Sequence, residues 1–280
     1  DSSTSRGLGD VYKRQDIILA VFLIFMTGLI FSPLGLGGGV IFMPILHYLL
    51  GWEIKVAILG SLILVWSVAM GSQIAHNRQG FGDIKMAQKG SLFAIPGAII
   101  GTIIGYLLIE IISDITIKIM ALSIVSWILY KAIIRMLNRE DITGEAIGEM
   151  NEKYWSIGVF FGGMSSGLLG IGGGGIFVTT NRNYGGFDTK SASGTSFMLA
   201  AMVVPTAIIS HIIIDGSAPQ IYELATAYAI IIPFLVASLS FTGAKYAINY
   251  LPVKTITSLF IIIISFSMIK YTQEIISMIV

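Results

Sequence analysis

The chain of 280 residues contains no cysteine and only three histidines, at positions 47, 76 and 211. The lack of cysteine excludes disulfide bonds, thiol catalysis and thiolate metal sites. Three dispersed histidines leave little material for a zinc site, because structural zinc needs several ligands close together. We therefore expect neither a bound metal nor a cofactor.

Charged residues are scarce as well. They make up 12% of the chain, against roughly 25% in a typical soluble domain. Hydrophobic residues make up 55%, so the few charges cannot cover the surface of a soluble protein of this length. The formal net charge of +1 gives no indication of a nucleic-acid partner. The composition predicts an all-α protein that passes through the lipid bilayer several times.

Long apolar runs indicate where the chain is expected to cross. A bilayer core requires about 20 apolar helical residues. The runs that meet this requirement are Val56–Ala75, Leu92–Ile112, Ile115–Leu137, Ser191–Ile214, Leu224–Ala244 and Thr255–Ile276. The second run contains Gly97, Gly101 and Gly105, which share one helical face and predict close packing against another helix.

Two other regions have a different pattern, in which an apolar run meets a cluster of glycines. Ile17–Pro33 is followed by Gly35–Gly39 and the short run Val40–Leu50, and Trp155–Leu169 is followed by Gly170–Gly175 and a short run that ends near Tyr184. Consecutive glycines destabilise a helix and would leave backbone groups unpaired in hydrocarbon. Such backbone is tolerated where it is buried in protein or lines a cavity. The pattern predicts two units, each composed of a helix, a glycine break and a half-helix.

The two units belong to an internal repeat. Gly28 and Gly163 are 163 − 28 = 135 residues apart, and the same spacing continues without a gap to His76 and His211. Within these 49 positions 16 residues are identical, including glycines, a lysine and a histidine that shared hydrophobicity does not explain. We predict two transmembrane repeats, 16–137 and 154–280, joined by a linker at 138–153. Residues 1–15 are polar and are expected to be a non-native or disordered tail.

The two repeats are expected to be inverted relative to each other. If each glycine unit returns to the side where it began, each repeat crosses the membrane three times and the second repeat takes the opposite orientation. Most basic residues, among them Arg78, Lys89 and Lys245, then fall on one side, as the positive-inside rule requires. If the glycine units instead cross once each, the repeats are parallel and the charge asymmetry is weaker.

Several motifs in this pattern resemble those of a known family. Each glycine cluster precedes an Ala-x-x-x-Ser segment, Ala57–Ser61 or Ala192–Ser196, and a loop with Gly82 leads to the segment Pro96–Gly101. From residue 16 onward the chain resembles the TauE/SafE family of sulfite and sulfonate exporters. The resemblance implies a secondary carrier in a prokaryotic inner or plasma membrane. Its substrates would be small sulfur-containing anions such as sulfite, sulfoacetate or other organosulfonates, often moved outward.

The glycine breaks are the candidate anion site. The first N–H groups of a helix attract anions, and broken helices at the middle of the membrane form the sites of many carriers. The residues that we expect to contribute are Gly37, Gly38, Gly39, Gly172, Gly173, Gly174 and Gly175, with hydroxyl groups from Ser61, Thr195 and Ser196 and a charge from Arg182. The side chains also have structural alternatives, because hydroxyls can bond their own helix and Arg182 can extend to the membrane surface.

Two histidines are candidates for proton coupling. His76 and His211 end equivalent apolar runs at the same position of the repeat. Histidine titrates near neutral pH, so either residue could relay a proton. The alternative is that each one only caps the end of a helix.

Nothing in the sequence indicates an enzyme. Gly163–Gly167 matches G-x-S-x-G, but a hydrolase elbow requires a strand–turn–helix context and this segment lies in an apolar run. No P-loop motif is present, so ATP hydrolysis is not expected. A passive anion channel and a non-transporting subunit of a membrane assembly stay open as alternatives to a carrier. The expected partners are a small sulfur-containing anion and the lipid bilayer, and a homo-oligomer is compatible with the sequence.

Overall fold

The structure is a computed structural model, which describes residues 2–111, 114–137, 149–225, 228–250 and 252–279. Every regular element within these residues is a helix. The elements are α1 (Ser2–Phe31), α2 (Gly39–Pro44), the π-helical turn η1 (Ile45–Leu49), α3 (Ile54–Arg78), α4 (Ile84–Ile111), α5 (Asp114–Leu137), α7 (Glu152–Leu169), α8 (Gly174–Tyr184), α9 (Thr189–Ile214), α10 (Ala218–Ala225), α11 (Tyr228–Tyr250) and α12 (Val253–Ile279). The prediction of an all-α protein is therefore confirmed for the described part of the chain.

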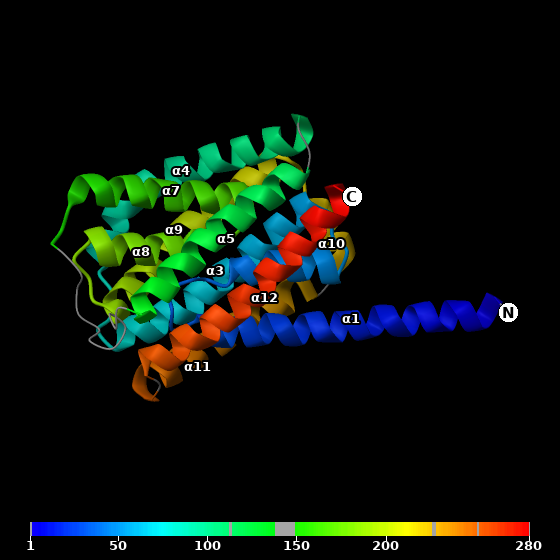
Figure 1. Cartoon of the computed structure of the whole chain (residues 1–280), viewed down its shortest axis with the longest axis horizontal. Coiled ribbons are helices and arrows are strands. Elements are labelled where there is room, and N and C mark those ends of the chain that lie inside the picture. Colours follow the sequence, from blue (N-terminus) through cyan, green and yellow to red (C-terminus); the bar gives the residue numbers. More distant parts are fainter. Residues whose placement is uncertain (1, 112–113, 138–148, 226–227, 251, 280) are drawn as a thin grey trace.

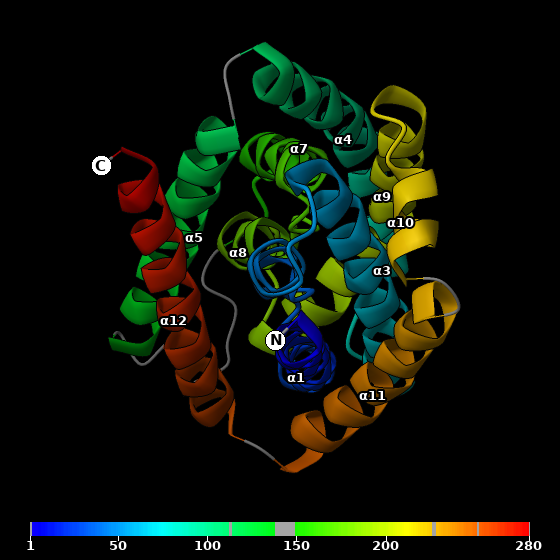
Figure 2. The same cartoon turned by 90° about the vertical axis from the view of Figure 1, so that its right-hand side faces the viewer.

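The long helices lie side by side along the longest axis of the molecule (Figure 1). Seen along that axis, α4, α5, α11 and α12 lie at the periphery, whereas α3, α7 and α8 lie nearer the centre (Figure 2). The burial of the apolar segments follows this arrangement, since 78% of the apolar window of α3 is buried, compared with 33% for α4 and 22% for α11. The peripheral helices thus expose the apolar surface that a bilayer would cover.

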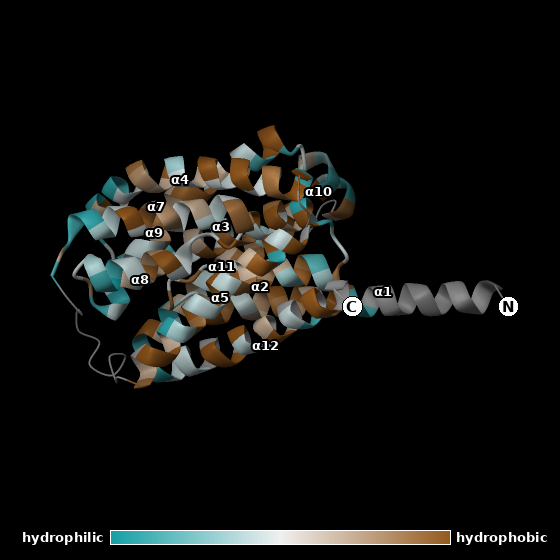
Figure 3. Ribbon diagram, turned by 45° about the horizontal axis from the view of Figure 1, so that its top comes forward, coloured by the Kyte–Doolittle hydropathy of each residue, from teal (hydrophilic) through white to brown (hydrophobic). Residues whose placement is uncertain are grey.

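Five described helical segments are long and apolar enough to cross a membrane: Ile54–Arg78, Ile84–Ile111, Ile115–Ile134, Thr189–Ile214 and Tyr228–Tyr250. Hydrophobic residues dominate along these helices, and hydrophilic residues gather at both ends of the bundle (Figure 3). Four of the predicted spans match these segments closely, apart from Ile112, which lies outside the described residues. The run Thr255–Ile276 lies within α12.

The predicted span Leu224–Ala244 is wrong at its beginning. Leu224 belongs to the short helix α10, which ends at Ala225, and the long helix α11 begins only at Tyr228. Ile221 of α10 packs against Val56 and Leu59 at the start of α3, so α10 covers the end of the bundle. Hydropathy alone joined these two helices because both are apolar.

The predicted boundaries of the tail, the two repeats and the linker stay predictions. Residues 2–15 continue the helix α1 that contains the first apolar run. Most of the predicted linker 138–153 lies outside the described residues, and its last two residues begin α7. The main apolar core draws on both halves of the chain, with Phe42 and Leu62 from the first and Phe177 and Phe197 from the second.

Each glycine cluster separates a long helix from a short one. The short helical segments are 39–49 and 174–184, which correspond under the 135-residue spacing because 39 + 135 = 174 and 49 + 135 = 184. Pro44 has no N–H group, and after it the first segment changes into the π-helical turn η1. Thr179 occupies the matching position, and α8 continues as one α-helix.

The segment α7–α8 is a hairpin. The backbone N–H of Asn151, just before α7, donates a 2.8 Å hydrogen bond to the carbonyl oxygen of Tyr184, the last residue of α8. The chain therefore returns after the glycine cluster to the end of the bundle from which α7 started.

Helices α3 and α9 pack in opposite directions. Lys55, at the start of α3, interacts electrostatically with Asp215, which follows the end of α9. Beyond the other end of α3, the N–H of Asp83 donates a 3.0 Å hydrogen bond to the hydroxyl of Thr195, near the start of α9. Between these points, Trp66 Nε1 donates to the carbonyl oxygen of Ala201 at 3.3 Å. Because 66 + 135 = 201, two positions that are matched in the sequence lie in contact.

The close packing predicted for the glycine face of α4 is confirmed. Gly97, Gly101 and Gly105 lie against the backbone of α7 at Phe160, Met164 and Leu168. No side chain would fit between these helices without a shift. The small residues therefore let α4 of the first half pack tightly against α7 of the second half.

Candidate functional site

Both glycine breaks contain backbone conformations that favour glycine. Gly35, Gly37 and Gly38 have φ angles of 76°, 73° and 80°, and the matching Gly170, Gly172 and Gly173 have 70°, 74° and 66°. Residues with a side chain rarely adopt this left-handed region. Gly38 and Gly173 are the N-cap residues of α2 and α8. The glycines therefore stop the chain after the long helices α1 and α7 and direct it into the short helices.

The two breaks meet backbone against backbone. A Cβ atom added to Gly39 would lie 2.6 Å from Cα of Ile171, and one added to Gly174 would lie 2.6 Å from the carbonyl carbon of Leu36. The two contacts are equivalent, since 36 + 135 = 171 and 39 + 135 = 174. The start of each short helix thus lies directly against the break of the other half.

We call the place where the breaks at 35–39 and 170–174 pack against each other the crossing. Two serines at matched positions of the repeat form hydrogen bonds across it. The hydroxyl of Ser61 donates to the carbonyl oxygen of Gly170 at 2.8 Å, and that of Ser196 donates to the carbonyl oxygen of Gly35, also at 2.8 Å. Each bond joins one half of the chain to the other, and both serines are fully buried. A hydroxyl has a single hydrogen, so these serines can only accept further hydrogen bonds in this arrangement. They hold the breaks together and have no donor left for an anion.

The beginnings of α2 and α8 provide the donors that suit an anion. The carbonyl oxygen of Gly38 accepts from the N–H groups of Ile41 and Phe42, at 2.9 and 3.0 Å. The carbonyl oxygen of Gly173 serves Ile176 and Phe177 in the same way. The earlier N–H groups of a helix have no carbonyl within the helix to bond, and they carry the positive end of its dipole. Two such helix starts, each buried against the glycine break of the other half, provide an environment for negative charge.

Of the other predicted side chains, Thr195 has a hydrogen-bond partner outside the two glycine breaks. Its hydroxyl accepts the N–H of Asp83 and so connects α9 with the beginning of α4.

Arg182 is buried in α8 with an exposed fraction of 1%, so its charge does not extend to the surface. The adjacent Asn181 is also buried and accepts a 2.9 Å hydrogen bond from Trp155 Nε1. Together with Thr179 and Thr180, these residues make α8 a polar short helix inside the protein.

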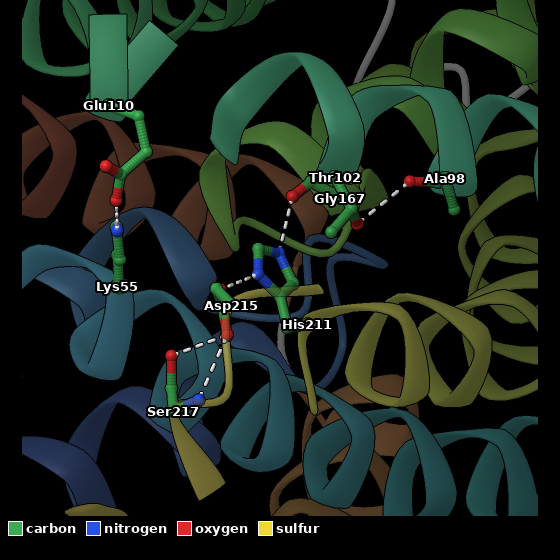
Figure 4. A network of polar contacts seen from close by, with 8 residues as sticks. All are labelled: Lys55, Ala98, Thr102, Glu110, Gly167, His211, Asp215 and Ser217. Carbon is green, nitrogen blue, oxygen red and sulfur yellow. Dashed lines mark hydrogen bonds and ion pairs between the residues drawn. The ribbon is translucent and has the colours of Figure 1, made fainter. Parts of the chain in front are cut away.

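The two candidate histidines lie at opposite ends of the bundle, because α3 and α9 are antiparallel. His211 has both ring nitrogens engaged, with Nδ1 2.7 Å from Oδ2 of Asp215 and Nε2 2.7 Å from the carbonyl oxygen of Gly167 (Figure 4). His76 bonds through Nδ1 to the carbonyl oxygen of its own helix neighbour Ser72, at 2.9 Å. The matched positions therefore have different surroundings.

Sequence reasoning did not identify Asp215 as a partner of His211. The two residues are four positions apart at the end of α9, a spacing that brings side chains together on a helix and could have indicated the pair. Ser217 adds two hydrogen bonds to the same carboxylate, from its hydroxyl at 2.6 Å and its N–H at 3.2 Å.

A second charged pair lies at the same end of the bundle. Lys55 forms an ion pair with Glu110, at the end of α4 (Figure 4). Its ammonium group also lies 5.1 Å from the centre of the Tyr106 ring. Lys55 also lines a surface cavity of about 660 Å³, together with His47, Tyr48, Trp52 and neighbouring residues. This end of the bundle therefore carries a surface cavity lined by charged residues of both signs, Glu53 and Lys55.

The fold and this crossing define a class of protein. Helices that can span a membrane, together with short helices that begin at glycine breaks inside the bundle, are typical of membrane transporters. The chain belongs to the sulfite exporter TauE/SafE family, whose family model matches residues 20–271. It is thus a membrane protein of a transporter family, as the sequence motifs predicted.

A curated relative agrees with this assignment. The chain is 28% identical over 231 residues to the probable membrane transporter protein YunE of Bacillus subtilis (strain 168), an alignment that covers 75% of this chain and 83% of the relative. No solved structure matches the chain.

Proposed function

We propose that this protein is a secondary transporter that exports small sulfur-containing anions, such as sulfite, sulfoacetate or other organosulfonates, across a prokaryotic cell membrane. The observation that carries the proposal is the crossing of the two glycine breaks. There the N-terminus of α2 lies against the second break, at Ile171, and the N-terminus of α8 lies against the first break, at Leu36. Their N–H groups suit a small oxyanion, which can accept several hydrogen bonds at once.

The mechanism that fits this arrangement is alternating access between two inverted repeats. The antiparallel packing of α3 and α9, the contact of Trp66 with Ala201, and the matched bonds of Ser61 and Ser196 all support a two-fold relation between the halves. In this proposal the α7–α8 hairpin is re-entrant in the membrane, and the halves rock around the crossing.

The anion site in this proposal consists of the backbone at 37–39 and 172–175. Ser61 and Ser196 hold the two breaks together, and Arg182 contributes positive charge from within α8. Thr195 positions α9 against α4 at the edge of the site. The crossing is closely packed in this conformation, so the anion enters when the two halves separate.

Transport by purified protein in proteoliposomes tests the proposal. Vesicles loaded with unlabelled sulfoacetate should take up external radiolabelled sulfoacetate by exchange, and sulfite should compete with it. A carrier exchanges anions without net current, whereas a passive channel would conduct sulfoacetate down its gradient with a current. Absence of both exchange and current, with folded protein in the vesicles, would remove the proposed function. A thermal-shift screen with sulfite, sulfate, sulfoacetate, taurine and carboxylates identifies the preferred ligand, because a bound ligand stabilises the folded protein.

A further inference from the structure

The hydrogen bonds of His211 require more hydrogens than a neutral imidazole has. Both ring nitrogens lie 2.7 Å from an acceptor, namely the carboxylate of Asp215 and the carbonyl oxygen of Gly167 (Figure 4). A backbone carbonyl only accepts, and a neutral imidazole carries one N–H. Both bonds can therefore exist together only if the pair of His211 and Asp215 holds one proton in addition to the neutral ring and the free carboxylate.

The surroundings of Asp215 indicate which residue carries this proton. Its other oxygen, Oδ1, already accepts the hydroxyl and the N–H of Ser217. Burial by itself raises the pKa of Asp215, but the hydrogen bonds from His211 and Ser217 outweigh burial and hold the pKa below its usual range. The carboxyl group is thus kept ionised, and the extra proton belongs on the imidazole ring.

We infer that the buried pair of His211 and Asp215 is the proton-binding site that couples the transport cycle to a proton gradient. This inference rests on the proposed transport function and adds the coupling ion to it. The side chains are 3% and 2% exposed, so the proton is held away from bulk water in this conformation. On release the imidazolium gives one proton to water, and a neutral imidazole and a carboxylate remain.

Loss of the proton changes the contact between two helices. The neutral ring has one N–H, so it can donate to Asp215 or to Gly167 but not to both. The lone pair of the other ring nitrogen then faces an acceptor oxygen, and that contact becomes repulsive. Gly167 lies in the last turn of α7, three residues before Gly170, where the second glycine break begins. Deprotonation therefore releases either α9 from α7 or the ring from its carboxylate, at a position directly attached to the candidate anion site.

The charged groups that face this pair come from α3 and α4. Lys55 of α3 interacts with Asp215, and Glu110 of α4 pairs with Lys55, next to the Tyr106 ring. From α7 the pair contacts the Gly167 backbone, and the titratable residues of that helix, at 152–154, lie in its first turn at the other end. Since Glu110 compensates the charge of Lys55, protonation of His211 decides the net charge of this cluster.

The matched histidine lacks these features. Asp215 corresponds to Gly80, since 80 + 135 = 215, so His76 has no carboxylate four residues later. Its ring faces two backbone groups, the Ser72 carbonyl 2.9 Å from Nδ1 and the Pro33 backbone, which within the described residues does not meet the geometry of a regular hydrogen bond to Nε2. Neither group carries a charge that would stabilise a second ring proton, whereas His211 faces the carboxylate of Asp215.

Nitrogen NMR of the ring atoms tests the protonation directly. The chain has only three histidines, so protein labelled with ¹⁵N-histidine in lipid nanodiscs gives three sets of signals, which His47→Gln and His76→Gln assign. Because both ring nitrogens of His211 face an acceptor, we expect both to give protonated signals in this conformation. Signals of a neutral ring alone from His211 would overturn the inference.

Transport assays with and without a pH gradient distinguish proton coupling from anion exchange. In proteoliposomes with equal pH on both sides, exchange of radiolabelled sulfoacetate should persist in His211→Gln and Asp215→Asn. Accumulation driven by an imposed pH gradient should be lost in both variants and retained in His47→Gln and His76→Gln. Gradient-driven accumulation that survives in folded His211→Gln would overturn the inference. Failure of wild-type exchange would instead contradict the proposed function, and the NMR measurement would still decide whether the pair holds a proton.

Discussion

The backbones of Gly39 and Ile171 approach so closely that even a methyl group at Gly39 would lie 2.6 Å from the Ile171 Cα atom. The same relation holds between Gly174 and Leu36. The start of the short helix in each half thus packs directly against the glycine break of the other half. Since neither short helix can move far without displacing the other break, the crossing joins the two halves mechanically.

The first prediction concerns these two contacts. Gly39→Ala and Gly174→Ala place a methyl group against backbone atoms that cannot rotate away, so each variant should lose about 1–3 kcal/mol of stability and most of its transport. Gly51→Asn is the control, because Gly51 has a φ of 68° but open space around it, and asparagine tolerates this conformation. Thermal unfolding and sulfoacetate exchange are the measurements. An unchanged melting temperature in both alanine variants would contradict the close approach.

The second prediction distinguishes a structural from a ligand role for the serines. Ser61→Ala leaves the buried carbonyl of Gly170 unpaired, and Ser196→Ala does the same to Gly35. Each variant should lose about 1–3 kcal/mol of stability. Thermal unfolding in increasing sulfoacetate should show the ligand-induced shift preserved in both. Ser238→Ala, at an exposed serine that bonds its own helix, is the matched control. A lost ligand shift at unchanged stability would mean that the hydroxyls bind the anion directly.

The third prediction concerns orientation in the membrane. The positive-inside rule places the basic end near Arg78 in the cytoplasm and the segment of α10 outside. Because the chain has no cysteine, Asn77→Cys and Tyr222→Cys introduce single labelling sites at exposed positions. A membrane-impermeant thiol reagent added to whole cells should label position 222 and spare position 77 until the membrane is opened. Labelling of both positions from the same side would refute the inverted arrangement.

The fourth prediction concerns acid stability. The pKa of Asp215 is lower in the folded protein than its ordinary value, so the folded state binds this proton less readily than the unfolded state. The ionised carboxylate therefore stabilises the fold above the ordinary pKa of an aspartate, about 3.9. This contribution is lost as the pH falls from that value through the lower folded pKa. Melting temperatures measured across this acidic range should fall more steeply in the wild type than in Asp215→Asn, and parallel curves would exclude this role for Asp215.

Much of the architecture could be read from local patterns in the sequence. Apolar runs of sufficient length predicted the long helices, because hydropathy and helix length depend on residues close together in the chain. The glycine clusters at 35–39 and 170–175 predicted an interruption within each cluster, because consecutive glycines disfavour a helix wherever they occur. The same local reading failed at Leu224, which hydropathy joined to the long helix but which belongs to the short helix α10.

The sequence by itself determined that identical residues recur 135 positions apart, which predicts similar roles for the matched positions. Only the tertiary structure decided which matched positions have equivalent contacts. Ser61 and Ser196 bond partners 109 and 161 residues away, and both bonds connect the two halves in the same way. His76 and His211 share their position in the repeat, yet only His211 meets both a carboxylate and a carbonyl. Contacts of this kind depend on how helices pack in three dimensions, which periodicity along the chain does not encode.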